Sequence, residues 1–346
     1  MAAGQGAGGA GRGERALTAQ AGRGPRLTLH TLPSLLAVAL FALMFGAGSL
    51  AYDGFFSGQV FLNLFIDNAF LIVVALGLSF VILGGGIDLS VGAVVALATM
   101  VLAALVETLQ WPPAAAVAAI LAGGLVFGTL QGVLVEVFEV PPFIATLAGM
   151  FLARGLCYLI SIDSIAIRHP QLEAFSQARL PLGPLGEVTP SVAVAAAVLA
   201  GAVWLAHGTT FGRTVYAIGG SERSARMMGL PVRATRIGMY ALCSGCAALG
   251  GLLFGTYTLS GYGLHGMGLE LDAIAAVVIG GALLSGGVGT VAGCVSGVLT
   301  LGAIQTLIAF DGSLSSWWTR IAIGVLLGLF CVLQRVMEWW HQRQAP

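Results

Sequence analysis

Lysine is absent from the chain, and all 15 of its basic residues are arginine. A Walker A loop needs a lysine on the nucleotide phosphates, and Schiff-base chemistry needs a lysine amine. The chain alone therefore cannot carry out either reaction. We expect it to bind no cofactor itself, so any ATP that drives its function must be hydrolysed by a partner.

Charged residues are also scarce, at 9% of the 346 residues against 58% hydrophobic ones, with a mean hydropathy of +0.95. Soluble domains carry about 25% charged residues, so this composition excludes a water-soluble fold. The apolar residues form blocks of about 18 to 25 residues, the length at which an α-helix crosses the hydrocarbon core of a bilayer. The sequence therefore predicts an all-α polytopic membrane protein.

Enzyme signatures are missing as well. The five cysteines lie in apolar blocks, which favours packing over disulfides, and the five histidines are scattered without an HExxH or GxSxG motif nearby. The GxGxxA pattern at 287–292 lies between apolar blocks and outside any βαβ unit. We therefore expect no catalytic residue, no metal site and no nucleic-acid partner.

The apolar blocks predict ten membrane spans. They are residues 31–52, 60–83, 89–108, 113–137, 142–162, 190–207, 236–258, 271–284, 289–309 and 316–334. The chain then divides into a disordered basic tail over 1–30, a transmembrane domain over 31–336 and a short C-terminal segment over 337–346. An even number of spans places both termini and the arginine-rich loop Gly208–Arg236 on one face, which the positive-inside rule assigns to the cytoplasm.

Two stretches far apart in the chain share one pattern. Ile87–Ala93 and Leu269–Ala275 both follow the order apolar, acidic, Leu, polar, two residues, Ala, and each opens an apolar helix. In the predicted topology the first lies towards the cytoplasm and the second towards the outside. Inverted repeats have this relation, and transporters built from them place the pathway at the repeat interface. We therefore expect an inverted repeat of broken helices.

Ionisable residues at membrane depth are costly and mark functional positions. They are Asp67, Asp88, Arg154, Glu270, Asp272 and Arg320. Asp88 with Ser90 can cap a helix, because side-chain oxygens satisfy the free amides at a helix start, and the same holds for Glu270 with Asp272. Both pairs can also line the translocation path or hinge a gate, and the two roles are compatible.

Asn63, Asp67 and Asn68 recur at helical spacing near the outer end of the second predicted span. We expect them to be candidates for the lining of the path, since a neutral solute needs hydrogen-bond partners but no strong countercharge. The alternative is that Asp67 pairs with Arg154, which is itself a path or gate candidate.

The loop between the sixth and seventh predicted spans encodes a two-turn helix. Ser221 is placed as its N-cap, Glu222 in its first turn, and Gly229 as its stop, with a proline after it. Apolar residues among arginines suit insertion into a groove of a cytosolic partner. The candidate contact residues are Ser221, Glu222, Arg223, Ala225, Arg226, Met227, Met228 and Gly229. The alternative is a surface loop attracted to anionic lipid.

Three stretches resemble the permeases of ribose-, xylose- and galactose-type ABC importers. They are GGGIDLSVGAVVAL from Gly84, VYAIGGSERSARMMGLPV from Val215 and ELDAIAAVVIGGALLSGGVGTVAG from Glu270. PPFIATLAGMFLARGLCYLIS from Pro141 and DGSLSSWWTRIAIG from Asp311 are most similar to the galactofuranose importer branch. The resemblance runs from about residue 32 to 340, and the basic tail before it departs from the family pattern.

The resemblance implies a ten-helix core in the bacterial inner membrane, with two permease chains side by side that are different chains in the galactofuranose branch. It implies a cytosolic ATPase with two nucleotide domains, which holds ATP and Mg, and a periplasmic sugar-binding protein. Residues 221–229 would be the coupling helix on the ATPase. The expected function is import of a neutral monosaccharide by alternating access. The alternative is an ion-coupled secondary sugar transporter.

Overall fold

The computed structural model describes residues 32–315 and 317–344, and the basic tail predicted over 1–30 lies outside them. The elements are α2 (Leu32–Ala51), α3 (Gly58–Leu83), α4 (Val91–Ala103), the π-helical turn η1 (Ala104–Thr108), α5 (Pro113–Glu136), α6 (Pro142–Ile160), β1 (Ile165–Ala166), α7 (Pro170–Gln177), β2 (Leu180–Pro181), the 3-10 turn η2 (Gly183–Leu185), β3 (Glu187–Val188), α8 (Pro190–Gly208), α9 (Thr210–Met227), α10 (Val232–Thr258), β4 (Ser260–Gly261), α11 (Leu269–Ile279), α12 (Gly293–Asp311) and α13 (Trp317–Gln344). The all-α prediction is confirmed.

Within the described residues, seven helical segments are long and apolar enough to cross a membrane, namely α3, α4 with η1, α5, α6, α8, α10 and α12. Shorter apolar stretches lie in α2 and α13. Together with α11 they correspond to the ten predicted spans. The boundaries of three long helices are set by proline, which occupies the first helical position of α5, α6 and α8, where its missing N–H has no intrahelical partner to lose.

The prediction of a full span over 271–284 is wrong, because α11 ends at Ile279. Eleven helical residues rise about 16 Å, roughly half of the hydrocarbon thickness. The helix stops at a turn in which Gly281, Gly286, Gly287 and Gly289 take positive φ values. Glycine adopts this backbone region without the steric cost that a side chain would bring, so the segment is a half-helix followed by a tight loop.

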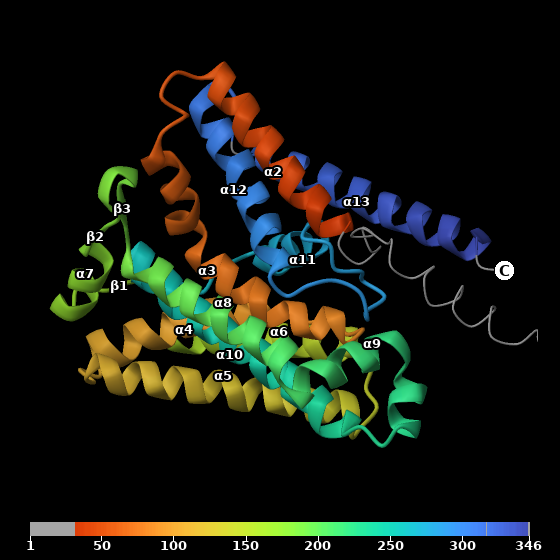
Figure 1. The fold of residues 1–346 in the computed structure, drawn as a ribbon. Helices are drawn as coiled ribbons and strands as arrows, with labels where there is room; N and C mark the ends of the chain where they lie inside the picture. The colour runs from red at the N-terminus through yellow and green to blue at the C-terminus, as the bar shows by residue number, and fades with distance from the viewer. Residues whose placement is uncertain (1–31, 316, 345–346) are drawn as a thin grey trace, which may run out of the picture.

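Helix α3 forms the centre of the bundle (Figure 1), with α2 and α12 on one side and α5, α8 and α10 on the other. Its inner two thirds are almost fully buried. The glycines at 124, 128 and 132 let α5 lie directly on the backbone of α10, since a Cβ at any of them would collide with α10. Small residues at such an interface replace the hydrophobic driving force that lipid does not supply.

The two broken helices meet at their first turns. Gly92 of α4 lies against the backbone of Gly266 and against the side chain of Glu270 at the start of α11. One segment reaches this contact from the α9 end of the molecule and the other from the end that carries β4. The two acidic turns are therefore neighbours inside the bundle, one at the start of the half-helix α11 and one before α4, which with η1 is long enough to cross a membrane.

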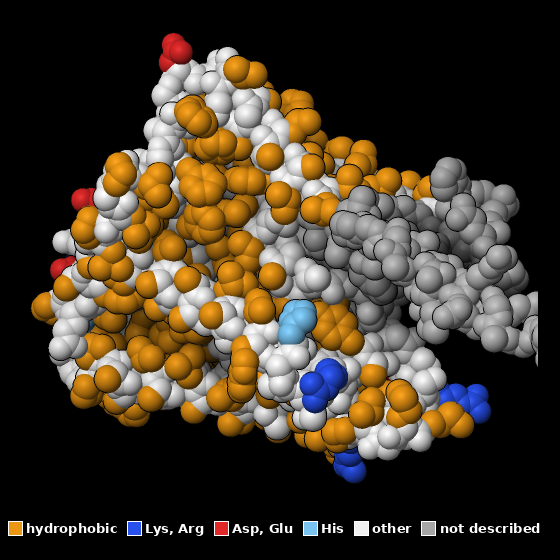
Figure 2. Space-filling model, viewed as in Figure 1, with side chains coloured by type: hydrophobic (Ala, Val, Ile, Leu, Met, Phe, Trp, Pro, Cys, Tyr) orange, Lys and Arg blue, Asp and Glu red, His pale blue; other side chains and the backbone are white. Residues whose placement is uncertain are grey.

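A small ordered cap covers the end opposite α9. β1 pairs with β4 and β2 pairs with β3, both antiparallel. The Glu107 side chain, on the π-helical turn, accepts hydrogen bonds from the backbone amides of Arg168 and His169 at 2.8 and 2.9 Å. Figure 2 shows acidic side chains at this end and arginines at the α9 end, in keeping with a positive inner face.

At the α9 end, four glycines from three segments pack backbone against backbone, and we call them the glycine junction: Gly85, Gly219, Gly286 and Gly287. The amide of Gly287 donates a 2.8 Å hydrogen bond to the carbonyl of Leu83 at the end of α3. A Cβ at Gly219 would collide with that same carbonyl and with the Gly287 amide. The junction thus connects α9 to the turn before α4 and to the loop after α11.

Candidate functional site

The predicted two-turn helix is present at the end of α9. Ser221 has extended backbone angles (φ −166°, ψ 102°) inside α9, which divides it into two helices. The Ser221 hydroxyl accepts a hydrogen bond from the Ser224 amide at 3.3 Å, as an N-cap does. Gly229 follows with a φ of +73° and ends the helix. The sequence signals for both ends of this helix are therefore confirmed.

Ion pairs hold the short helix against the bundle. Glu136, at the end of α5, accepts from Arg226 at 2.9 Å and from Arg236 at 2.7 Å. Glu222 bonds the same two arginines at 2.8 and 2.6 Å. Hydrogen bonding to Arg236 holds the pKa of Glu222 below its ordinary value. The four side chains form a closed ring that ties residues 222–226 to α5 and α10.

The apolar side chains of the short helix separate into two groups. Ala225 is fully buried and packs against Ile218 and Val232. The expectation that it contacts a partner is wrong for this conformation, because it is the inward anchor of the helix. Met227 and Met228 keep 79% and 67% of their surface exposed. The helix therefore exposes two flexible apolar side chains, while Ala225 and the ion pairs hold its backbone against the bundle.

Asp88 and Ser90 lie in the interior. Both have no exposed surface, and the Asp88 carboxylate accepts from the amide and the hydroxyl of Ser90 at 2.8 and 2.7 Å. The Ser90 hydroxyl also lies 3.3 Å from Oε1 of Gln131 on α5. Ser90 makes no side-chain cap of α4. Asp88 instead forms a turn with the amide two residues on, so these residues shape the start of α4.

Arg154 of α6 binds the backbone that leads into α11. Its Nη1 donates to the carbonyls of Gly263 and His265 at 2.6 and 2.7 Å. The alternative pairing with Asp67 is not made, since Asp67 accepts a 3.1 Å hydrogen bond from the Tyr257 hydroxyl. Arg154 thus fixes the approach to the first turn of α11, next to Glu270.

The three polar residues of α3 divide between surface and interior. Asn63 and Asp67 are exposed, one turn apart. Asn68 is buried, donates to the Leu64 carbonyl at 2.9 Å and packs against Gly302 of α12. Of these three residues, only Asn63 and Asp67 therefore lie on the exposed surface of α3.

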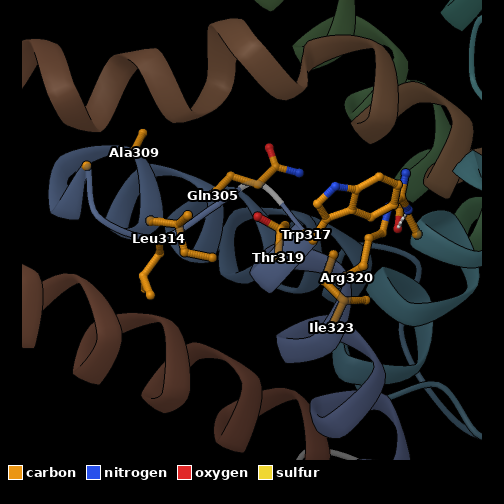
Figure 3. Close-up of a pocket in the computed structure, with 10 residues that line it drawn as sticks. Gln305, Ala309, Leu314, Trp317, Thr319, Arg320 and Ile323 are labelled. Atoms are coloured by element: carbon orange, nitrogen blue, oxygen red, sulfur yellow. Dashed lines mark hydrogen bonds and ion pairs between the residues drawn. The ribbon is translucent and has the colours of Figure 1, made fainter.

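Asp272 lines a groove of about 600 Å³ between the start of α11, the second half of α12 and the start of α13. Both of its carboxylate oxygens accept from Nη1 of Arg320, at 2.7 and 2.9 Å. Figure 3 shows Gln305, Trp317, Thr319 and Arg320 gathered at one end, with Ala309 and Leu314 towards the other. Sequence reasoning missed Gln305, Trp317 and Thr319. The WW pair within an otherwise apolar span was the signal that could have found Trp317.

The sequence of the chain is similar to those of known membrane permeases. Residues 60–331 match the family described as "Branched-chain amino acid transport system / permease component". The chain is 46% identical to the inner membrane ABC transporter permease protein YjfF of Escherichia coli, over 91% of this chain and 96% of YjfF. It is 40% identical to the fructose import permease FruG of Bifidobacterium longum (91% and 94% covered). It is 35% identical to the ribose import permease RbsC of Escherichia coli (84% and 89% covered).

No solved structure matches the chain. The relatives are permeases, and a permease component is one part of a larger transport system. The chain therefore belongs to the permease family of ATP-binding-cassette importers that includes these sugar importers, and it is a multi-pass membrane transport component rather than an enzyme.

Proposed function

We propose that this chain is the permease subunit of an importer that moves a neutral monosaccharide across the bacterial inner membrane, with galactofuranose as the sugar. The stretches from Pro141 and from Asp311 support the galactofuranose assignment by their resemblance to that branch. Relatives named for fructose and ribose support the sugar class. Their names give no support to the ion-coupled alternative.

The observation that carries this proposal is the short helix over 221–229. Two exposed methionines stand on a helix that a buried alanine and a ring of four ion pairs hold in place. Methionine is flexible and polarizable, and it adapts well to a groove on a partner. Because the helix is held firmly against the bundle, a movement of the partner would be passed on to the rest of the permease. A coupling helix on an ATPase must do this.

The proposed mechanism starts at this helix. ATP binding closes two nucleotide domains of the cytosolic ATPase and moves the coupling helix, and the glycine junction passes the movement to the turn before α4 and the loop after α11. The permease then opens outward below a periplasmic sugar-binding protein. A second, related permease chain completes the path, membrane lipid surrounds the assembly, and both termini lie in the cytoplasm.

The path candidates differ in their access to a solute. Asn63, Asp67 and Asp272 would line an outward-facing path, a role supported by the exposure of Asn63 and Asp67 and by the groove beside Asp272. The other candidates would act by shaping the first turns of α4 and α11 and their gate. Asn68, Asp88 and Ser90 are buried, Arg154 binds backbone carbonyls, and Glu270 is partly buried against Gly92 of α4. In this proposal the path carries hydrogen-bonding side chains, and three of the five charged candidates, Asp88, Arg154 and Glu270, belong to the gate.

The double variant Met227→Asp/Met228→Asp tests the coupling role. Burying a methionine contributes about 1.5–3 kcal/mol, so losing two such contacts should lower ATPase affinity by at least a hundredfold and abolish sugar uptake. The matched control, Met227→Leu/Met228→Leu, keeps the apolar surface and should retain uptake. Normal uptake by the aspartate variant, with the chain present in the membrane, would contradict the assignment.

A second measurement separates the importer from the ion-coupled alternative. Gentle affinity purification of the tagged chain should bring down a Walker-motif ATPase and a second permease, both identifiable by mass spectrometry. Sugar uptake in liposomes should need that ATPase and ATP. Full uptake by the chain alone, with collapse when an uncoupler is added, would overturn the proposal.

A further inference from the structure

The groove beside Asp272 carries polar groups that have no hydrogen-bond partner among the described residues. Among the described residues, neither the Gln305 amide nor the Thr319 hydroxyl makes a hydrogen bond. Gln305 is exposed and lies in the second half of α12. An amide that faces hydrocarbon without a partner costs several kcal/mol. This face of the helix is therefore better suited to water, a polar solute or a polar surface of the second permease than to lipid.

The charge in the groove is balanced. Asp272 is 14% exposed and Arg320 50% exposed, and the two form a 2.7 Å ion pair. Two bonds to Nη1 satisfy the Asp272 carboxylate, while Nη2 makes only a 3.4 Å contact with the Met267 carbonyl. Arginine has five N–H donors in a fixed plane. The pair thus offers spare donors without a net charge that would attract an ion.

An aromatic face completes the groove. Trp317 lines it and is 74% exposed, whereas the neighbouring Trp318 does not line it. A flat indole surface beside donors and acceptors matches a sugar ring, which has one apolar C–H face and a rim of hydroxyls. Ile308 and Ile323 supply further apolar surface.

We propose that this groove is a sugar-recognition site in the outer half of the path. Trp317 stacks on the apolar face of the sugar, and Gln305, Thr319 and Arg320 bond its hydroxyls. The Asp272–Arg320 pair holds the guanidinium in place. The inference rests on the proposed import of a neutral sugar and assigns its selectivity to residues of this chain, in addition to those of a binding protein.

The test measures uptake by the assembled importer in liposomes, with radiolabelled galactose (which includes the furanose form at equilibrium), ribose, fructose and leucine as probes. Trp317→Ala should raise the sugar concentration at half-maximal uptake at least tenfold, and Trp317→Phe should restore part of the loss. Trp318→Ala is the matched control and should stay within twofold of wild type. Gln305→Leu should change the ratio of uptake among the three sugars.

The outcomes separate this inference from the function on which it rests. If the wild-type importer carries none of the sugars, the proposed function itself fails. If it carries a sugar and Trp317→Ala behaves like Trp318→Ala, with both variants assembled and hydrolysing ATP at the wild-type basal rate, the groove is not the recognition site. If the groove variants impair leucine uptake alone, the ligand class is wrong.

Discussion

Alanine at Gly219 should destabilise the glycine junction, whereas alanine at the next residue, Gly220, should not. A Cβ at Gly219 has no room, because it points at the Leu83 carbonyl and the Gly287 amide, both of which are backbone atoms. A Cβ at Gly220 would meet nothing within 4 Å. The two glycines are neighbours in α9, so comparing the two alanine variants distinguishes the effect of close packing from the effect of helix propensity.

The magnitude follows from three contributions. Forcing a methyl group into packed structure costs about 1–3 kcal/mol. Loss of the 2.8 Å hydrogen bond between Gly287 and Leu83 adds about 0.5–1.5 kcal/mol. The gain of about 1 kcal/mol from replacing a helical glycine applies to both variants and cancels. The Gly219→Ala variant should therefore be less stable than Gly220→Ala by about 2–4 kcal/mol.

Thermal unfolding of the purified chain in detergent measures this difference. A chain of this length shifts by roughly 2 °C per kcal/mol, so the Tm of Gly219→Ala should lie about 4–8 °C below that of Gly220→Ala. Coupling should change as well, with ATP hydrolysis by the assembled importer less responsive to sugar in Gly219→Ala. Equal Tm values for the two variants would refute the packing argument for the junction.

Two further predictions concern the ends of the molecule. Because its folded pKa lies below the ordinary value of 4.5, Glu222 stabilises the fold above that pH and loses this effect as pH falls through the folded pKa. The Tm difference between wild type and Glu222→Gln should therefore be constant at neutral pH and vanish in acid; a difference that persists in acid would contradict the ion-pair ring. Glu107→Ala should release the outer cap, so trypsin should cleave after Arg168 several times faster than in wild type, with Glu107→Gln intermediate; unchanged cleavage would show that other contacts hold the cap.

Much of the fold could be predicted because its signals are local. The lengths of the apolar blocks predicted the spans, and an N-cap serine and a stop glycine predicted the helix over 221–229. The span over 271–284 failed because apolar content alone does not show where a helix stops. The glycines in that stretch take positive φ values, and Gly286 and Gly287 among them pack at the junction with segments distant in sequence.

The candidate site was less predictable, since its geometry depends on contacts between distant segments. Asp67 bonds Tyr257, and Arg154 bonds the carbonyls of Gly263 and His265, so the pairing of Asp67 with Arg154 that the sequence left open as an alternative is absent. Ala225 carries the same helical signal as the methionines near it, yet only packing against α10 shows that it points inward.

The sequence by itself determined that the chain is helical, lies in the membrane, leaves ATP hydrolysis to a partner and carries a short capped helix in its arginine-rich loop. These properties depend on residue composition and on signals within a few residues. Only the tertiary structure decided which polar groups are exposed, how α4 and α11 meet at their first turns and that Gln305 and Trp317 share a groove. The physical reason is that a side chain's surroundings are set by helices packed against it from elsewhere in the chain.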